Sequence, residues 1–431
     1  MTVLTTTILL FSLFVALFLL NVPIAVSLGT AATAILFLGG KFSLYMIVQR
    51  MFAALLAPPL LAIPAFVVAG VLMSRGGVAK YLINALRAWI GHLPGGLSVV
   101  TILACAIFAA ISGSSPATAA AIGAIMLPAM LEGGYPKRYA MGLIAAGGTL
   151  GILIPPSVTL IIYGITAEES IGKLFMGGLL PGLFLAGILL ISAVFYAKKN
   201  GFGQGEKATW EERWQASVKA IPGAFLPVFI LGSIYSGVVT PTEAAVLSVF
   251  YTLFVSIFIY KELHWSDLRQ VFRDFVNTIS MVYLVIAAAM VFSLYITDAQ
   301  IPNLVGEWIK GANLGKFTFF LVANLMFFVM GTFLEAVSIT LITLPILLPM
   351  IRHLDIDLIQ FAIVMTVNME LAMITPPVGL NLFVVSNMAK ERLEEVVKGV
   401  VPFIIIMIAV MILFMVWPDI SLYIPRVLMG N

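Results

Sequence analysis

The sequence has few charged residues. Only 10% of its 431 residues are Asp, Glu, Lys or Arg, whereas 61% are hydrophobic. Ordinary soluble domains carry about 25% charged residues, so a water-soluble fold could not bury this much apolar surface. The net charge of +3 comes without a basic tract, which gives no reason to expect nucleic acid as a partner. The composition predicts an all-α integral membrane protein.

Cysteine and histidine are also scarce. The one cysteine, Cys105, excludes an intramolecular disulfide, and its apolar neighbours favour a small buried side chain over a reactive thiol. The three histidines (His92, His264 and His353) have no partner at a spacing typical of a metal or catalytic site. No GxxxxGK[ST] motif is present, so ATP bound to this chain is not expected to supply energy.

Positive charge is missing from the N-terminal region, where no Lys or Arg precedes Lys41. A secretory signal peptide needs a positive n-region, so the first apolar stretch is expected to remain as a spanning helix. With the N-terminus outside, most Lys and Arg residues fall in inside loops, as the positive-inside rule requires. Arg50, Lys173 and Arg352 are among the few that are assigned to outside loops.

Many segments are long and apolar enough to approach the roughly 20 residues of a spanning helix. The expected spans are 3–21, 22–40, 52–74, 95–112, 140–165, 174–197, 222–239, 242–260, 278–297, 317–332, 358–386 and 400–418. Two more segments, 113–131 and 333–351, are rich in small residues or broken by proline. We interpret each as a re-entrant hairpin together with the helix before it, because irregular backbone at membrane depth needs protein or water around it.

A polar connection at 196–223 is expected to be an inside linker, and amphipathic stretches at 75–96 and 302–313 are expected to lie in the membrane interface. The predicted organisation is a scaffold part with an arm (1–94), a transport part (95–197), a linker (198–221), a second scaffold part with an arm (222–316), a second transport part (317–418) and a tail (419–431).

The chain contains a weak internal repeat. A shift of 221 residues places Pro155-Pro156 on Pro376-Pro377, and Leu127-Pro128 on Leu348-Pro349. In the loop assignment the first half starts outside and the second half starts inside, so the two halves are predicted to have inverted topology. Inverted repeats with broken helices at matching positions indicate the midplane site of a secondary transporter. The alternative is a pair of simple proline kinks, which are common in spanning helices.

The first predicted turn, "ISGSSPATAAAIG", combines hydroxyl groups with an irregular backbone, and "AAGGTLGILIPPS" is expected to face it. Hydroxyls and free carbonyls are oxygen ligands that suit Na⁺, although small-residue helix packing is the alternative.

The second turn, "MGTFLEAVSIT", is expected to face "TVNMELAMITPPVG". Glu335 and Glu370 are acids in apolar surroundings, which mark functional sites. Each of these two acids is compatible with three roles, namely proton carrier, cation ligand or helix-cap partner. Asn368 and Thr375 could complete an oxygen-rich shell around them. Glu243, by contrast, is expected to be a first-turn acid at a helix N-terminus.

The motifs "SGSSPATAAAIGAIMLP", "GTLGILIPPSV", "VVTPTEAA" and "TPPVGLNLFV" resemble the large membrane subunit of tripartite ATP-independent periplasmic (TRAP) transporters. The resemblance covers nearly the whole chain. It implies an elevator-type transporter of the bacterial or archaeal inner membrane that takes up organic acids such as C4-dicarboxylates or sialic acids with Na⁺. It also implies two partners, a small four-helix membrane subunit as a separate chain and a soluble periplasmic substrate-binding protein.

The resemblance also implies site residues. One implied Na⁺ site comprises Ser112, Gly113, Ser114, Pro116, Gly147, Gly148 and Thr149. The other comprises Gly331, Phe333, Glu335, Asn368, Glu370 and Met373. The residues expected to contact substrate are Ser114, Ser115, Thr118, Pro155, Pro156, Thr375, Pro376, Pro377 and Asn381.

Three other functions compete with this hypothesis. A stand-alone two-hairpin anion transporter coupled to Na⁺ or H⁺ has the same physical basis. A membrane-embedded enzyme would need a nucleophile or a metal partner beside Glu335 or Glu370, and the motifs supply none, so no enzyme activity is expected. A channel is less compatible with two broken repeats around one site.

Overall fold

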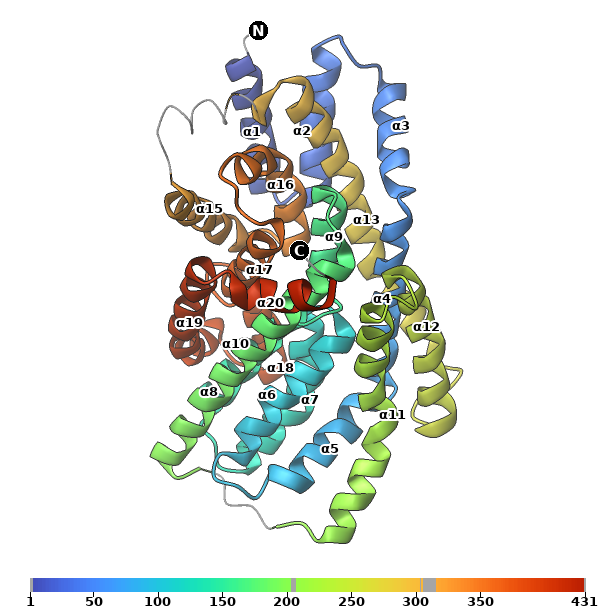
Figure 1. Cartoon of the computed structure of the whole chain (residues 1–431), viewed down its shortest axis with the longest axis vertical. Helices are drawn as coiled ribbons and strands as arrows, with labels where there is room; N and C mark the ends of the chain where they lie inside the picture. Colours follow the sequence, from blue (N-terminus) through green and yellow to red (C-terminus); the bar gives the residue numbers. More distant parts are fainter. Residues whose placement is uncertain (1–2, 203–206, 303, 305–314, 430–431) are drawn as a thin grey trace.

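The computed structural model describes residues 3–202, 207–302, 304 and 315–429, and the regular elements among them are helices (Figure 1). Eight of the described helical segments are long and apolar enough to cross a membrane. The elements are α1 (Val3–Leu19), α2 (Ile24–Leu38), α3 (Leu44–Leu55), η1 (Pro58–Leu61), α4 (Ala62–Arg75), α5 (Val78–Ile90), α6 (Gly96–Ser112), α7 (Ser115–Glu132), α8 (Lys137–Thr149), η2 (Leu150–Ile152), α9 (Val158–Ala167), α10 (Ile171–Asn200), α11 (Trp210–Tyr235), α12 (Pro241–Phe254), η3 (Val255–Ile259), α13 (Leu268–Asp298), α15 (Lys316–Gly331), α16 (Ala336–His353), α17 (Leu358–Met373), α18 (Leu380–Ala389), α19 (Leu393–Val416) and α20 (Asp419–Met429).

One expected span and the expected C-terminal tail differ from the observed helices. The segment expected as one helix at 52–74 is interrupted, because α3 ends at Leu55 and α4 begins only at Ala62. Pro58 and Pro59 lie in the break and form a short 3₁₀ turn, since proline cannot donate the backbone hydrogen bonds that would continue a helix. The expected C-terminal tail is also helical in part, and α20 packs against α10.

The expected polar linker is shorter than 198–221. Helix α10 continues to Asn200, and α11 begins at Trp210. A capping box explains this early start, because the Thr209 side chain accepts from the Glu212 N–H while the Glu212 carboxylate accepts from the Thr209 N–H. The second amphipathic arm, 302–313, lies almost wholly outside the described residues.

Helix boundaries repeat along the chain. Helix α7 runs from Ser115 to Glu132 and α16 from Ala336 to His353, so both ends are displaced by 221 residues. The starts of α8 (Lys137) and α17 (Leu358) differ by the same 221 residues. The proline punctuation seen in the sequence therefore coincides with a repeat of local structure.

The two repeats pack tightly on each other where α8 crosses α19. A Cβ atom on Gly142 would lie 2.1 Å from the carbonyl oxygen of Gly399, and one on Gly399 would lie 2.1 Å from the carbonyl oxygen of Arg138. Only residues without side chains permit this approach. Beside the crossing, Lys137 pairs with Glu391 at 2.8 Å, and the Arg138 guanidinium pairs with Glu395.

The first amphipathic arm forms α5, which packs against α6 and α11. Its polar edge is fixed by Lys80, whose ammonium lies 2.8 Å from a carboxylate oxygen of Glu262. The hydrogen bond from Lys80 holds the pKa of Glu262 below its usual value. Farther along the arm, the Trp89 indole N–H donates to the Ser217 hydroxyl at 2.9 Å.

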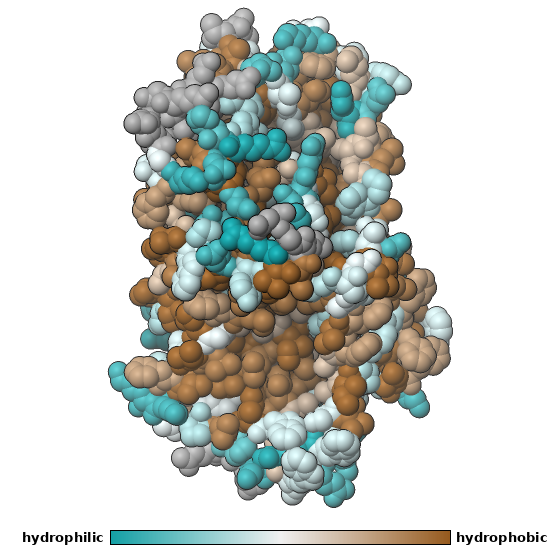
Figure 2. Space-filling model, in the orientation of Figure 1, coloured by the Kyte–Doolittle hydropathy of each residue, from teal (hydrophilic) through white to brown (hydrophobic). Residues whose placement is uncertain are grey.

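The visible surface is strongly apolar over much of its lower half, with hydrophilic side chains below this region and scattered across the upper half (Figure 2). Helices α1 to α3 reach the top of the view, whereas α5 and the start of α11 lie at the bottom (Figure 1).

Glu243 caps α12 together with Thr240, as expected for a first-turn acid with a structural role.

Candidate functional site

The first candidate site is built on the two-residue turn between α6 and α7. Gly113 ends α6 with a left-handed backbone, φ +60°, and a Cβ there would lie 2.9 Å from the carbonyl oxygen of Pro156. Both constraints favour glycine at this position. Ser114 then precedes α7, and Pro116 lies in the first helical turn, where its missing N–H costs little.

Three side-chain or backbone oxygens converge at this turn. The hydroxyls of Ser112 and Thr118 lie 2.7 Å apart, and the Thr118 hydroxyl donates to the Ser114 carbonyl oxygen at 2.9 Å. Ser112 and Thr118 are both buried, whereas Ser114 is half-buried. The turn therefore offers a compact set of oxygens, with Ser114 on its more accessible side.

A residue from the second repeat completes this turn. The Asn381 side-chain N–H donates to the Ser115 hydroxyl at 2.8 Å and to the Ala145 carbonyl oxygen at 3.1 Å. Asn381 lies in α18 and is fully buried, and its side-chain oxygen has no hydrogen-bond partner among the described residues. The sequence placed Asn381 in the substrate set without indicating this contact.

The broken segment after α8 lies against the same turn. A Cβ on Gly148 would come within 2.6 Å of the Ala119 side chain, and one on Gly151 within 2.5 Å of the Ser114 carbonyl oxygen. Gly147 instead faces Cys105, and the Thr149 hydroxyl donates to the Ala146 carbonyl oxygen in its own helix. Two of the expected residues thus have their described contacts away from the turn.

Pro155 and Pro156 are buried in this broken segment, and the peptide bond between them is cis. Pro156 contacts the Gly113 turn through its carbonyl oxygen. The following Ser157 begins α9, because its side chain accepts from the Leu160 N–H and donates to the Ile152 carbonyl oxygen. The non-helical segment at Pro155-Pro156 and the N-terminus of α9 therefore both lie beside the first turn.

The second candidate site has the same arrangement. Helix α15 ends at Gly331, where a Cβ would lie 2.4 Å from the Ala372 side chain of α17. Across the turn, the Val378 N–H donates to the Thr332 carbonyl oxygen at 3.2 Å. The turn between α15 and α16 is therefore held against the broken segment that follows α17.

Pro376 and Pro377 in this second broken segment are exposed, unlike Pro155 and Pro156, and their peptide bond is also cis. Thr375 is half-buried, and its hydroxyl donates to the Leu371 carbonyl oxygen at 2.7 Å. The two sites thus differ in how far their Pro-Pro segments are accessible.

Phe333, expected in the second Na⁺ site, has a side chain that is 47% exposed and packs edge-on against Phe18 of α1. Only its backbone is available to the turn. Met373 is buried at the end of α17. Neither side chain supplies an oxygen.

Asn368 has a partner that the sequence reasoning missed. Its side-chain N–H groups donate to the backbone oxygen and the side-chain oxygen of Asn324, both at 2.9 Å. Asn324 is a buried polar residue in the apolar run of α15, and its isolation in that run was the available signal. The pair joins α15 to α17 ahead of the turn.

The two acids have different surroundings. Glu335 directly precedes α16 in the second turn, and its Oε1 is buried with no partner among the described residues. Glu370 is fully buried in α17, and neither carboxylate oxygen has a described partner. Ala372 faces Gly331, and two helical residues span about 200°, so Glu370 lies on the opposite face of α17 from that contact.

Comparisons with known proteins agree with this architecture. Residues 11–420 match the family "Tripartite ATP-independent periplasmic transporter, DctM component". The chain is 40% identical to the C4-dicarboxylate TRAP transporter large permease protein of Rhodobacter capsulatus, over 97% of this chain and 98% of the relative. It is 38% identical to the isethionate TRAP transporter permease protein DctMQ of Oleidesulfovibrio alaskensis, over 96% of this chain and 65% of that longer relative.

The crystal structure of the Alcanivorax borkumensis YdaH transporter has a similar fold, with a TM-score of 0.63 at 14% identity and 88% coverage of each chain. The chain is therefore an all-helical, multi-pass protein. Its family match shows that it is a transporter component of the inner membrane rather than an enzyme. It belongs to the DctM family, the large permease subunits of tripartite ATP-independent periplasmic transporters.

Proposed function

We propose that this chain imports a small organic acid by Na⁺-coupled secondary transport, using an elevator movement of two inverted repeats. The observation that carries the proposal is the pairing of each polar turn with a broken helix: Gly113 lies against Pro156, and Thr332 lies against Val378. Broken helices at corresponding positions of two repeats are typical of secondary transporters with a midplane site.

The first turn suits a coupling cation. The hydroxyls of Ser112 and Thr118 and the carbonyl oxygen of Ser114 lie within hydrogen-bond distance of one another. A hard cation such as Na⁺ prefers such oxygen ligands. We propose one Na⁺ site at this turn, with Ser114 as its accessible residue, and a second at the Glu335 turn.

The substrate is proposed to bind between the turns. Ser115 and Asn381 join the repeats there, and the starts of α7 and α9 provide helix N-termini, which attract anions. The relatives named for C4-dicarboxylate and isethionate support an organic anion as cargo. A C4-dicarboxylate is the proposed cargo class because three relatives named for it are 39–40% identical to this chain.

We also propose two protein partners. A periplasmic binding protein would deliver the acid, and a small membrane subunit would act as a separate chain. The tripartite nature of the family supports both. The DctMQ relative extends well beyond the part that this chain covers, which fits a second component joined to it in that protein.

Vesicle uptake tests the proposal. The complex of this chain, its small subunit and its binding protein is reconstituted, and succinate uptake is compared under inward Na⁺ and choline gradients. We expect uptake with Na⁺ and little with choline. Equal uptake in both, accelerated by a proton gradient, would overturn Na⁺ coupling.

That outcome would favour the second candidate, an anion transporter coupled to protons. Glu370 supports this alternative, because a buried acid without a hydrogen-bond partner is costly in a membrane and is commonly kept for proton or ion transfer. Uptake without the binding protein would further favour a transporter that works alone.

A further inference from the structure

A large cavity lies apart from both turns. Its volume is about 930 Å³, and its walls come from α3, η1, α9, α13 and α16. None of the predicted site residues lines it. Helices α3 and α13 belong to the proposed scaffold, whereas α9 and α16 belong to the proposed mobile part, so the cavity lies between the two.

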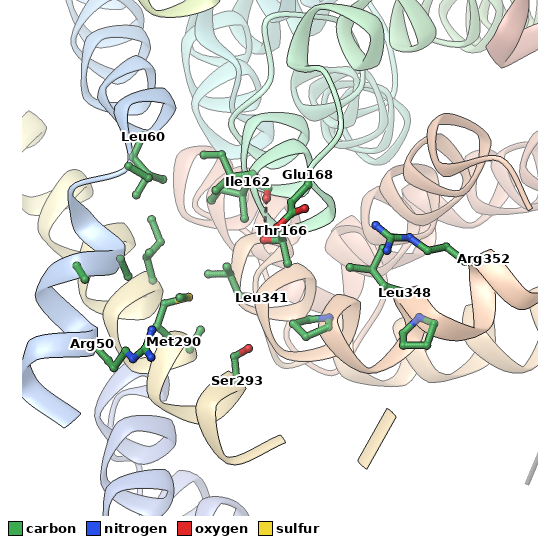
Figure 3. A pocket seen from close by; sticks show the side chains of 18 residues that line it. Arg50, Leu60, Ile162, Thr166, Glu168, Met290, Ser293, Leu341, Leu348 and Arg352 are labelled. Carbon is green, nitrogen blue, oxygen red and sulfur yellow. Dashed lines mark hydrogen bonds between the residues drawn. The ribbon is translucent and has the colours of Figure 1, made fainter. Parts of the chain in front are cut away.

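Two arginines lie on opposite sides of this cavity, Arg50 from α3 and Arg352 from α16 (Figure 3). Both are exposed, and neither has an ion-pair partner among the described residues. The remaining walls are mainly apolar, with the hydroxyls of Thr166 and Ser293 among them. Small-molecule sites typically combine apolar walls with a few placed polar groups, in volumes of about 300–1,000 Å³.

One acid also lines the cavity. Glu168 follows α9 and likewise has no ion-pair partner among the described residues. Two guanidinium groups against one carboxylate leave the lining with an excess of positive charge. An anion would therefore be attracted, and Glu168 would weaken that attraction.

We propose that this cavity is an entrance site that takes up the organic acid, through Arg50 and Arg352, before the acid reaches the turns. The inference rests on the proposed function and deepens it. Both arginines lie at the face expected to be outside, where the binding protein would release its cargo. One arginine lies on each proposed part, and a guanidinium suits a carboxylate geometrically, so each part supplies one binding position for a carboxylate of the acid.

The first test measures succinate uptake by the complete reconstituted complex. We expect Arg50→Gln and Arg352→Gln each to raise the KM several-fold with a smaller change in kcat, and the double variant to lose part of the salt dependence of KM. Glu168→Gln should lower the KM. Lys173→Gln is the matched control, because this cation on the same expected face does not line the cavity.

A parental KM in the double arginine variant would overturn the entrance site. So would an equal rise in KM for Lys173→Gln. Weaker association of the loaded binding protein with the arginine variants, at an unchanged KM for acid once docking is saturated, would assign the arginines to protein docking instead.

A second readout does not depend on transport. Phenylglyoxal labels exposed arginines, and mass spectrometry of the complex would follow Arg50, Arg352 and the exposed control Arg87. Succinate, but not uncharged succinamide, should slow labelling of the first two and leave Arg87 unchanged. Absence of protection would contradict the entrance site, whereas protection without Na⁺-dependent uptake would contradict only the proposed coupling.

Discussion

Asn381 in α18 donates a hydrogen bond to the hydroxyl of Ser115 in α7 across a sequence separation of 266 residues. The same amide group donates to the Ala145 carbonyl oxygen in α8. One side chain of the second repeat thus holds two helices of the first, next to the turn proposed to bind Na⁺.

We expect Asn381→Ala to destabilise the protein by about 1–3 kcal/mol, because it leaves buried acceptors without their donor. Ser115→Ala should cost less, since the Ala145 carbonyl oxygen keeps its partner. The double variant should lose less stability than the two single variants lose in sum, because both single changes remove the same Asn381–Ser115 hydrogen bond. Thermal unfolding of the purified complex measures all three, and strict additivity would contradict the coupling.

Ser114→Ala should raise the half-saturating Na⁺ concentration several-fold with little change in thermal stability. Its hydroxyl is half-buried at the turn and has no described hydrogen bond, so its loss removes a potential cation ligand rather than a packing contact. Ser192→Ala is the control, because that hydroxyl bonds only within its own helix. A parental Na⁺ response in Ser114→Ala would leave backbone carbonyls as the ligands there.

Glu335 and Glu370 should respond differently to conversion to glutamine. Glu335→Gln is expected to raise the half-saturating Na⁺ concentration, since this residue lies in the turn itself. Glu370→Gln should leave the Na⁺ response near the parental value, because it lies on the face of α17 opposite the turn contact. Uptake at several Na⁺ concentrations, with and without a proton gradient, distinguishes them.

A changed Na⁺ response in Glu370→Gln alone would place the coupling ion beside the buried Glu370 side chain of α17, away from the turn. Loss of a proton-gradient effect in that variant would make Glu370 a proton carrier.

A disulfide between α4 and the first turn should stop transport. A Cβ on Gly70 would lie 3.7 Å from the Cβ of Ser112, which suits a disulfide. Gly70 belongs to the proposed scaffold and Ser112 to the proposed mobile part, so oxidation of a Gly70→Cys/Ser112→Cys variant should trap one state. Cys105→Ala would be the background.

The control for this crosslink joins α2 to α13 within the proposed scaffold. A Cβ on Gly29 would lie 3.3 Å from the Cβ of Ala288, and oxidation of Gly29→Cys/Ala288→Cys should be tolerated. Uptake by each variant is compared before and after reduction of the disulfide, which separates the effect of the crosslink from the effect of replacing Ser112. Unchanged transport with the first crosslink fully formed would refute the proposed elevator division.

The sequence predicted the multi-span helical fold because hydropathy and proline spacing are local signals. The repeat was visible for the same reason, and its helix boundaries agree with the shift of Pro155 onto Pro376. The break at Pro58 was missed because its apolar neighbours read as one continuous span. The Asn381–Ser115 and Asn324–Asn368 contacts depend on how distant helices cross, which periodicity does not encode.

The large cavity illustrates the same limit. Arg50 and Arg352 were assigned to separate outside loops, and nothing in their sequence neighbourhoods links them. Only the packing of α3, α13 and α16 places both on one cavity.

The close crossing of Gly142 and Gly399 has a consequence for biogenesis. Helix α8 leaves the ribosome long before α19, and the Ser115 partner Asn381 follows 266 residues later. At about 5–20 residues per second, synthesis of Asn381 follows that of Ser115 by roughly 13–53 s. Until then, Ser115 lacks its hydrogen-bond partner and the glycine-lined surface of α8 is not covered by α19. During that interval the nascent chain would depend on lipids or insertion factors to cover this surface, and changes that slow synthesis of the second half should increase its degradation.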